Sequence, residues 1–367
     1  MPAPNYTRPQ LFLAALNEIT FGGRLCLGLL RGREPEPAFA ELPSSCNDEA
    51  VLNRYREFDL GAFEDRLAAL LEKHAVGLLA LGNPSYPERL AVLTDPPPLL
   101  YVRGSIADLG RPLLAGVGSR KASRYGLDAV RALVPGLVEA GLGLVSGLAR
   151  GIDAEVHRAT LAAGGRTVAV LGCGIGTVYP PEHTELADAV ANQGAVISEF
   201  PIDHGPLSAN FPRRNRVISG LGLGVVVFEA ALRSGSLVTA YQALHQNREV
   251  FAVPRSMFDR DRQGTNALLS RGAKLVTTVE HILEELTPLG LVTREPERPN
   301  KELLVPTLTS DQALVIECLD PERAVTLDQV VNSSGLSPEA ALAALLELSL
   351  VGVVVETKGA RYLKSNR

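Results

Sequence analysis

Two loops in the middle of the chain combine glycine and serine with basic side chains. GVGSRKASRYG (116–126) and SGLARGID (146–153) each follow an apolar run. Glycine lets a ligand approach the backbone closely, and the helix expected after each loop offers N–H groups and its positive dipole end to an anion. Both loops predict phosphate binding, and tight packing of strand against helix explains the glycines equally well. The side chains available there are Ser119, Arg120, Lys121, Arg124 and Arg150.

A third loop, SEFPIDHGPLSANFPRRNRVISGLG (198–222), carries arginines close to a phenylalanine. Guanidinium groups match phosphate oxygens, and an aromatic ring can stack on a base. The alternative is a solvated arginine face held in salt bridges. Further helices open at 234–236 and 264–266, so several anion-binding sites at one sheet edge would suit a chain of phosphates better than one nucleotide. The residues of the third loop that predict nucleic-acid binding are Phe211, Arg213, Arg214 and Arg216.

Other chemistries lack their motifs. LGCGIGTVYPPEH (171–183) spaces its glycines as G-x-G-x-G, and prolines follow where a dinucleotide-binding loop needs a helix. The sequence contains no GxxxxGK[ST], HExxH or GxSxG, and its four cysteines lie far apart. His157 is expected to pack within its helix, and Asp153 to stabilise a helix start. We expect no catalytic centre, metal or cofactor.

Alternating strand and helix patterns position these loops. Short apolar runs rich in Val, Ile and Leu, separated by amphipathic helices, are typical of a mostly parallel, doubly wound sheet. Ligands of such sheets bind at the carboxyl ends of the strands. The fold class is therefore α/β, with an extended Rossmann-like sheet. The expected strands are 113–118, 142–147, 167–172, 195–200, 224–230, 249–254 and 273–277.

The pattern divides the chain into four parts. We expect residues 1–83 to form a small helical N-terminal domain. It either resembles a SAM or helix-hairpin-helix module at Gly22-Gly23 or is a packed helical cap. Residues 84–286 form the Rossmann-like DNA-binding domain, 287–308 a linker, and 309–367 a winged-helix-like domain. The expected recognition helix, SPEAALAALLEL (337–348), has no basic residue. Since phosphate binding needs cations, that helix should contact protein or simply pack.

Charge and composition limit the possible locations and partners. The 367 residues are 46% hydrophobic, with a net charge of −5. Residues 111–216 hold eleven basic and nine acidic side chains, so nucleic acid would bind locally, in the middle of the chain. The chain has neither a signal-like start nor an apolar run that could cross a membrane. We expect a cytoplasmic protein with no membrane contact.

The succession of motifs through residues 84–286 resembles the DNA processing protein A (DprA or Smf) family of bacteria. One departure is Val253-Pro254-Arg255-Ser256, where the family usually has Pro-Gly-Ser, and it adds a cation near the site. The motifs in order are YPERLAVLTDPPPLLYVRG, GVGSRKASRYG, SGLARGIDAEVHRATL, VLGCGIGTVYPPEH, SEFP, NFPRRNRVISGL, VVVFEA, SGSLVTA and GTNALLSRGAKLV.

The resemblance implies a role without catalysis. Members bind single-stranded DNA during natural transformation, form homodimers, and help load the RecA recombinase in place of single-strand-binding protein. A role in repair is equally compatible. The resemblance also implies a dimer or RecA surface at about 264–279, with Ala267, Leu268 and Leu275. The DNA-binding residues that it implies are Ser119, Arg120, Ser146, Gly147, Arg150, Phe211, Arg213, Arg214 and Asn215.

An enzyme is the alternative from another class. Rossmann enzymes of the lysine-decarboxylase-like group cleave nucleoside monophosphates and carry PGGxGTxxE at the position of SGSLVTA (234–240). The glutamate of that motif is missing here.

Overall fold

Apolar side chains on both faces of a central sheet organise the chain in the computed structural model. The structure describes residues 6–30, 32–287, 309–320, 323–350, 353–357 and 361–364. The chain divides into two compact units, residues 1–294 and 295–367. Apart from Thr287, the expected linker 287–308 lies outside the described residues.

The first unit contains a nine-stranded sheet in the order β1-β2-β6-β5-β4-β3-β7-β8-β9. The strands from β6 to β9 in this order run parallel, which confirms the extended Rossmann-like sheet. The seven expected strands are β3 (Leu113–Gly118), β4 (Gly143–Ser146), β5 (Thr167–Val170), β6 (Ala195–Ser198), β7 (Gly224–Glu229), β8 (Glu249–Ala252) and β9 (Lys274–Leu275).

Two further strands extend one edge of the sheet. β1 (Gly77–Ala80) and β2 (Leu99–Gly104) pair with each other, and β2 pairs with β6, both in antiparallel fashion. The sequence reasoning did not identify these strands. The boundary expected between residues 83 and 84 falls between them, inside one sheet.

Helices cover both faces of the sheet because neighbouring strand residues point to opposite sides. Leu114 packs in one cluster with α8 (Arg124–Glu139) and α9 (Ile152–Ala162). Ala115 packs in another with α11 (Asn210–Leu221) and α12 (Gly235–His245). The remaining helices of this region are α10 (Thr184–Gln193), α13 (Gly264–Leu269) and α14 (Glu280–Leu286).

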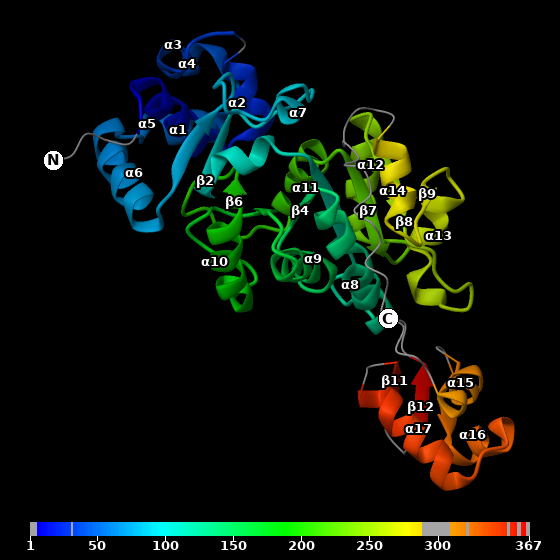
Figure 1. Cartoon of the computed structure of the whole chain (residues 1–367). Coiled ribbons are helices and arrows are strands. Elements are labelled where there is room, and N and C mark those ends of the chain that lie inside the picture. Colours follow the sequence, from blue (N-terminus) through cyan, green and yellow to red (C-terminus); the bar gives the residue numbers. More distant parts are fainter. Residues whose placement is uncertain are drawn as a thin grey trace. The chain divides into compact units, whose positions relative to one another are not determined.

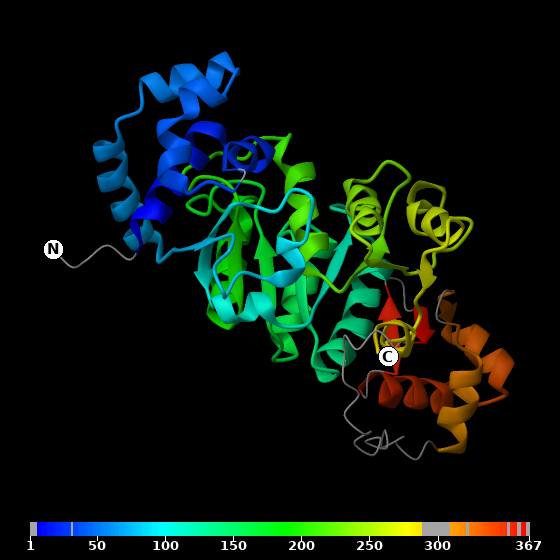
Figure 2. The same cartoon turned by 90° about the horizontal axis from the view of Figure 1, so that it is seen from above.

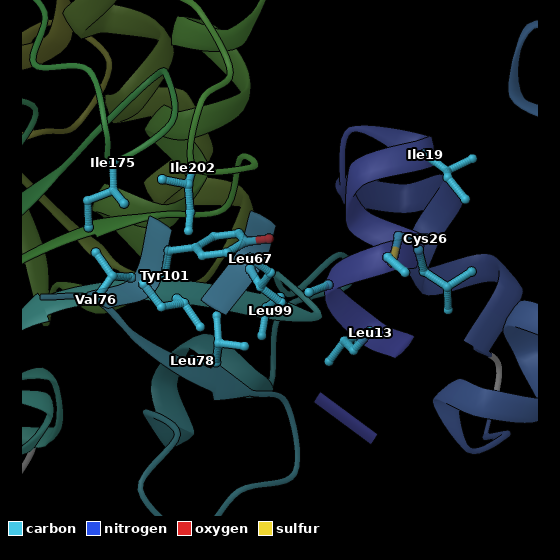
Figure 3. Packing of buried hydrophobic residues seen from close by; sticks show 14 of the residues in the cluster. Leu13, Ile19, Cys26, Leu67, Val76, Leu78, Leu99, Tyr101, Ile175 and Ile202 are labelled. Carbon is cyan, nitrogen blue, oxygen red and sulfur yellow. The ribbon is translucent and has the colours of Figure 1, made fainter. Parts of the chain in front are cut away.

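The N-terminal helices share a core with the antiparallel edge. In Figures 1 and 2 they lie, in blue, at one end of the sheet, and the yellow segment with α13 lies at the other. Figure 3 shows Leu78 of β1 with Leu99 and Tyr101 of β2, which belong to one buried cluster with Leu13 and Cys26. The helices are α1 (Arg8–Thr20), α2 (Gly23–Leu30), α3 (Pro35–Ala40), α4 (Leu42–Ser45), α5 (Glu49–Arg56), α6 (Leu60–His74) and, after β1, α7 (Glu88–Ala91).

The second unit follows the expected winged-helix outline. It comprises α15 (Ser310–Glu317), α16 (Leu327–Ser334) and α17 (Pro338–Leu350), with a small sheet in the order β10-β12-β11. The strands are β10 (Val325–Thr326), β11 (Val354–Thr357) and β12 (Arg361–Lys364). Val330, Leu345 and Tyr362 lie in its core. None of the described helices, in either unit, is both long and apolar enough to span a membrane.

The junction between α10 and β6 tests the packing of the sheet. Gly194 is buried there, and a Cβ atom on it would overlap the carbonyl oxygen of Thr167 on β5. We predict that Gly194→Ala lowers the free energy of unfolding by about 1–3 kcal/mol, because the backbone of β5 must move. Gly28→Ala is the control, since its Cβ meets nothing within 4 Å in α2 and alanine favours helix. Urea denaturation followed by circular dichroism measures the free energy of unfolding of both variants. Equal values would contradict the close packing of Gly194 against β5.

Candidate nucleic-acid interface

A cavity of about 840 Å³ opens at the carboxyl edge of the sheet. It lies where the strand order reverses between β3 and β7, the position at which doubly wound sheets bind ligands. The loops after β3, β4, β6 and β7 contribute to its wall, as the sequence predicted. Its polar and aromatic lining residues are Ser119, Arg120, Lys121, Asp153, Tyr179, Ser208, Phe211, Arg214, Asn215, Ser234, Ser236, Thr239, Asp261 and Arg262.

Arg214 occupies the inner wall of this cavity and is only 3% exposed. Its Nη1 donates to the carbonyl oxygens of Gly147 (2.6 Å) and of Val170, at the ends of β4 and β5. Burial lowers the pKa of Arg214 to about 10, against the opposing effect of the Asp153 carboxylate. Arg214 therefore remains a cation at neutral pH and joins α11 to the ends of two strands.

Asp153, in the first turn of α9, is 7% exposed and lies near Arg214. Its carboxylate accepts hydrogen bonds from the backbone N–H groups of Gly118, Gly147 and Ala149. Burial raises the pKa of Asp153, while Arg214 and these donors act in the opposite direction. These amide groups were expected to face a phosphate, and the chain's own carboxylate occupies them instead.

Glu229 plays the same part at the end of β7, where it is 1% exposed. Its carbonyl oxygen accepts from Ser119 N–H at 2.8 Å, and its carboxylate accepts from Ser123 N–H at 3.1 Å. Arg255 and Arg262 pair with the carboxylate at 3.1 and 3.2 Å. These bonds to Glu229 thus hold the loop after β3 in place. The sequence signal for this role was an acidic residue that ends an otherwise apolar strand.

The cation added by the departure at residues 253–256 is neutralised. The Arg255 side chain is 11% exposed and pairs with Glu229 and, at 2.6 Å, with Asp259. Its guanidinium lies 4.7 Å from the centre of the Tyr125 ring. Arg255 therefore supports the loop between β3 and α8.

Arg120 and Lys121 are the exposed cations at the mouth of the cavity. Within the described part of the chain, no carboxylate lies within 4 Å of either side chain. The Arg120 guanidinium lies 5.1 Å from the centre of the Phe211 ring, and that ring lies 5.7 Å from Tyr179. Together, Arg120, Phe211 and Tyr179 form a partly exposed platform. The sequence alone did not identify Tyr179 as part of it. Its signal was an aromatic residue directly before two prolines in a loop at the strand ends.

Other predicted residues lie outside the lining of this cavity. Arg124 pairs with Asp128 at 3.6 Å, and Arg150 with Glu182 at 2.5 Å, all four side chains being exposed. Ser146 is buried and donates to the carbonyl of Gly116. The cavity brings together Ser119, Arg120, Lys121, Phe211, Arg214 and Asn215 of the predicted set; its lining omits Arg124, Ser146, Gly147, Arg150, Arg213 and Arg216.

Arg213 and Arg216 lie on the other side of α11. Arg216 is 7% exposed and pairs with Glu199 at 2.5 Å and with Asp95 at 3.5 Å. Its burial and its two carboxylates give Arg216 a structural role on this side of α11. Arg213 is partly exposed, and its guanidinium lies 5.1 Å from the centre of the Phe200 ring.

The residues expected on a dimer or RecA surface differ in exposure. Leu275, on the edge strand β9, is 46% exposed, and Ala267 is half-buried. Leu268, on α13, is 3% exposed and packs in the core, so its side chain is covered by its own chain. Nearby segments expose Leu244, Met257 and Phe258.

Removing the Arg214 guanidinium should weaken the fold itself. Arg214→Ala would leave two carbonyl groups and the Asp153 carboxylate without their buried cation. We predict a loss of about 3 kcal/mol in the free energy of unfolding. Arg120→Ala is the matched control and should change it by less than about 0.5 kcal/mol, because that side chain is exposed. Equal stability of the two variants in urea denaturation would show that Arg214 does not hold the strand ends.

Comparisons with known proteins identify the family of the chain. Residues 77–287 match the family model of DNA recombination-mediator protein A, and residues 295–360 match that of the DprA winged helix domain. Protein Smf of Escherichia coli is 41% identical over 310 residues, covering 83% of this chain and 82% of its own. DNA processing protein DprA of Bacillus subtilis is 40% identical, covering 63% and 78%.

Solved structures give the same answer. DNA processing protein A from Streptococcus pneumoniae superimposes with a TM-score of 0.66 at 35% identity, covering 78% of this chain and 99% of its own. DNA processing protein A from Helicobacter pylori, whose structure concerns its single-stranded DNA binding mode, superimposes with a TM-score of 0.53 at 27% identity, covering 59% and 98%. On the family match, the identity of the relatives and the shared fold, the chain belongs to the DNA recombination-mediator protein A family, also called DprA or Smf.

Proposed function

We propose that the protein binds single-stranded DNA across the mouth of the cavity between β3 and β7. The observation that carries the proposal is the platform of Arg120, Phe211 and Tyr179, with Lys121 beside it. A guanidinium group and an ammonium group neutralise phosphates, and an accessible ring stacks on a base. The related protein from Helicobacter pylori binds single-stranded DNA, which supports the same ligand here.

The platform favours single strands over duplexes. Bases stacked within a duplex hide their faces, whereas an unpaired base can lie flat on an aromatic ring. Tyr179 is 36% exposed, whereas Phe211 is half-buried with the guanidinium groups of Arg120 and Arg214 over its ring, so the Tyr179 ring is the more accessible of the two. The ligand would thus contact mainly side chains, because the N–H groups of Gly118, Gly147 and Ala149 already bond to Asp153 and that of Ser123 to Glu229.

The same two carboxylates weigh against the nucleotide-cleaving alternative. A nucleoside monophosphate in a Rossmann loop needs backbone N–H groups for its phosphate. Here the N–H groups of Gly118, Gly147 and Ala149 bond to Asp153, and that of Ser123 bonds to Glu229. The segment SGSLVTA also lacks the glutamate of those enzymes. We therefore infer a binding protein without catalysis, metal or cofactor.

We further propose that the bound strand is passed to the RecA recombinase in transformation or recombination, with single-strand-binding protein as the displaced partner. A homodimer would form along the exposed surface near β9, around Leu275. The apolar side chains of Leu244, Met257 and Phe258 support a protein contact in this region. The α17 helix presents Glu339 and Glu347 and would contact protein rather than DNA. All four cysteines are unpaired, which supports a cytoplasmic location.

Charge reversal at the platform tests the DNA site. We predict that Arg120→Glu lowers affinity for a single-stranded oligonucleotide by at least about tenfold, because one phosphate contact becomes repulsive. Phe211→Ala should lower it by about 1–3 kcal/mol through lost stacking. Fluorescence anisotropy with labelled single and double strands measures both effects.

The control for these variants is Arg56→Glu, which makes the same charge change on exposed α5. It should leave affinity within about twofold of the wild type, because Arg56 is exposed and lies outside the lining of the cavity. If both single variants, Arg120→Glu and Phe211→Ala, bind the oligonucleotide with wild-type affinity, the assignment of the site is wrong.

A further inference from the structure

Neighbouring arginines of α11 face two different cavities. Arg214 lines the cavity already described, whereas Arg213 lines a second one of about 530 Å³. This second cavity lies between α11 and the turn that joins α1 to α2, with Gly22, Gly23 and Arg24 in its wall. Pro212 lines both cavities, so they adjoin at the first turn of α11.

The second cavity carries an excess of guanidinium groups. Arg24, Arg213 and Arg216 line it, against the single carboxylate Asp95. Asp95 accepts from Arg24 at 3.3 Å and pairs with Arg216 at 3.5 Å, and Glu199 also pairs with Arg216, so two carboxylates serve the three cations. Within the described ranges, no carboxylate lies within 4 Å of Arg213.

A buried donor of Arg216 lacks an acceptor. Its Nε and Nη2 face Asp95 and Glu199, but its Nη1 has no hydrogen-bond partner among the described residues. Arg216 is more than nine-tenths buried and lines the cavity. Buried polar groups in native proteins are almost always satisfied, so this donor indicates an acceptor that the chain itself does not supply.

The backbone at this place is shaped to admit a ligand. Phe21, Gly22 and Gly23 follow one another with φ of 54°, 68° and 69°, and this left-handed turn brings the first residues of α2 to the cavity wall. The φ of 69° at Gly23 favours glycine, and a Cβ atom there would press on the guanidinium of Arg213, which would have to shift. The turn thus sets the N-terminal N–H groups of α2 beside arginine, an arrangement suited to an anion.

An aromatic group lies next to this turn. The Phe21 ring is 36% exposed and lies 4.9 Å from the His204 ring. The carbonyl oxygen of Phe21 accepts from Arg213 Nη2 at 3.1 Å, which ties Arg213 to the turn. The cation over the Phe21 ring is Arg54, whose guanidinium lies 4.7 Å from the ring centre, whereas that of Arg213 lies over Phe200.

We propose that the second cavity binds a further phosphate of the same DNA strand. The strand leaves the first cavity, crosses α11 at Pro212, and places a backbone phosphate between Arg213, Arg24 and the start of α2. A neighbouring base lies against Phe21. This inference rests on the proposed function, and it makes the N-terminal helices part of the DNA-binding surface.

Oligonucleotide length separates the two cavities. An oligonucleotide of about 5 nucleotides would fill one cavity, and one of about 20 would reach both. We expect Arg24→Glu to lower affinity for the longer oligonucleotide by about tenfold and to leave that for the shorter one unchanged. Arg24 suits the test because its side chain is 83% exposed and lies outside the first cavity. Fluorescence anisotropy of the full-length protein measures both affinities, and circular dichroism confirms that the variant is folded.

The controls separate this inference from the proposed function. Arg8→Glu should leave both oligonucleotides unaffected, because Arg8 is exposed and lies at the start of α1, about 18 Å along that helix from the turn at Gly22. Arg120→Glu should weaken both. The second site is overturned if Arg24→Glu binds the longer oligonucleotide as the wild type does, or weakens both lengths equally. It is also overturned if Arg8→Glu reproduces the effect. If Arg120→Glu weakens neither length, the proposed function fails at its own site, whatever the result at Arg24.

Discussion

A cation buried at the carboxyl edge of the sheet determines how the loops around it are placed. Removing a guanidinium group from water is costly unless hydrogen-bond acceptors surround it. Arg214 meets this condition through the carbonyls of Gly147 and Val170, with Asp153 nearby. Asp153 in turn orders the amides of the loops after β3 and β4. The exposed cations at the cavity mouth are therefore carried on loops that internal charges hold in place.

This constraint changes what a Rossmann-like edge can bind. In nucleotide-binding members of this architecture, loop amides and helix N-termini receive a phosphate. Here Asp153 and Glu229 receive many of those donors, and both are carboxylates supplied by the chain itself. Ligand contacts shift outward to Arg120, Lys121 and the aromatic rings. Side chains spread over a rim suit a flexible polymer of phosphates better than a single nucleotide.

The sequence predicted the parallel strands and the loops well, because buried strands read as apolar runs and glycine marks their ends. It missed β1 and β2, since AVGLLALG (75–82) directly continues a helical run and LLYVRG follows three prolines. It could not sort the arginines of residues 213–216. Successive residues of a helix point about 100° apart, so Arg214 faces the first cavity while Arg213 and Arg216, three residues apart, both face the second. The pairing of Arg150 with Glu182 depends on tertiary contacts that local sequence does not contain.

The salt dependence of binding tests the central claim, which is that Arg120 and Lys121 neutralise phosphates of a single strand. Each phosphate neutralised on a single strand adds about 0.7 to the slope of log K against log salt concentration. Titration of the wild type and of an Arg120→Ala, Lys121→Ala double variant should give slopes that differ by about 1.4, the wild type being steeper. Identical slopes would contradict the account, because the two exposed cations would then make no contact with the phosphate backbone.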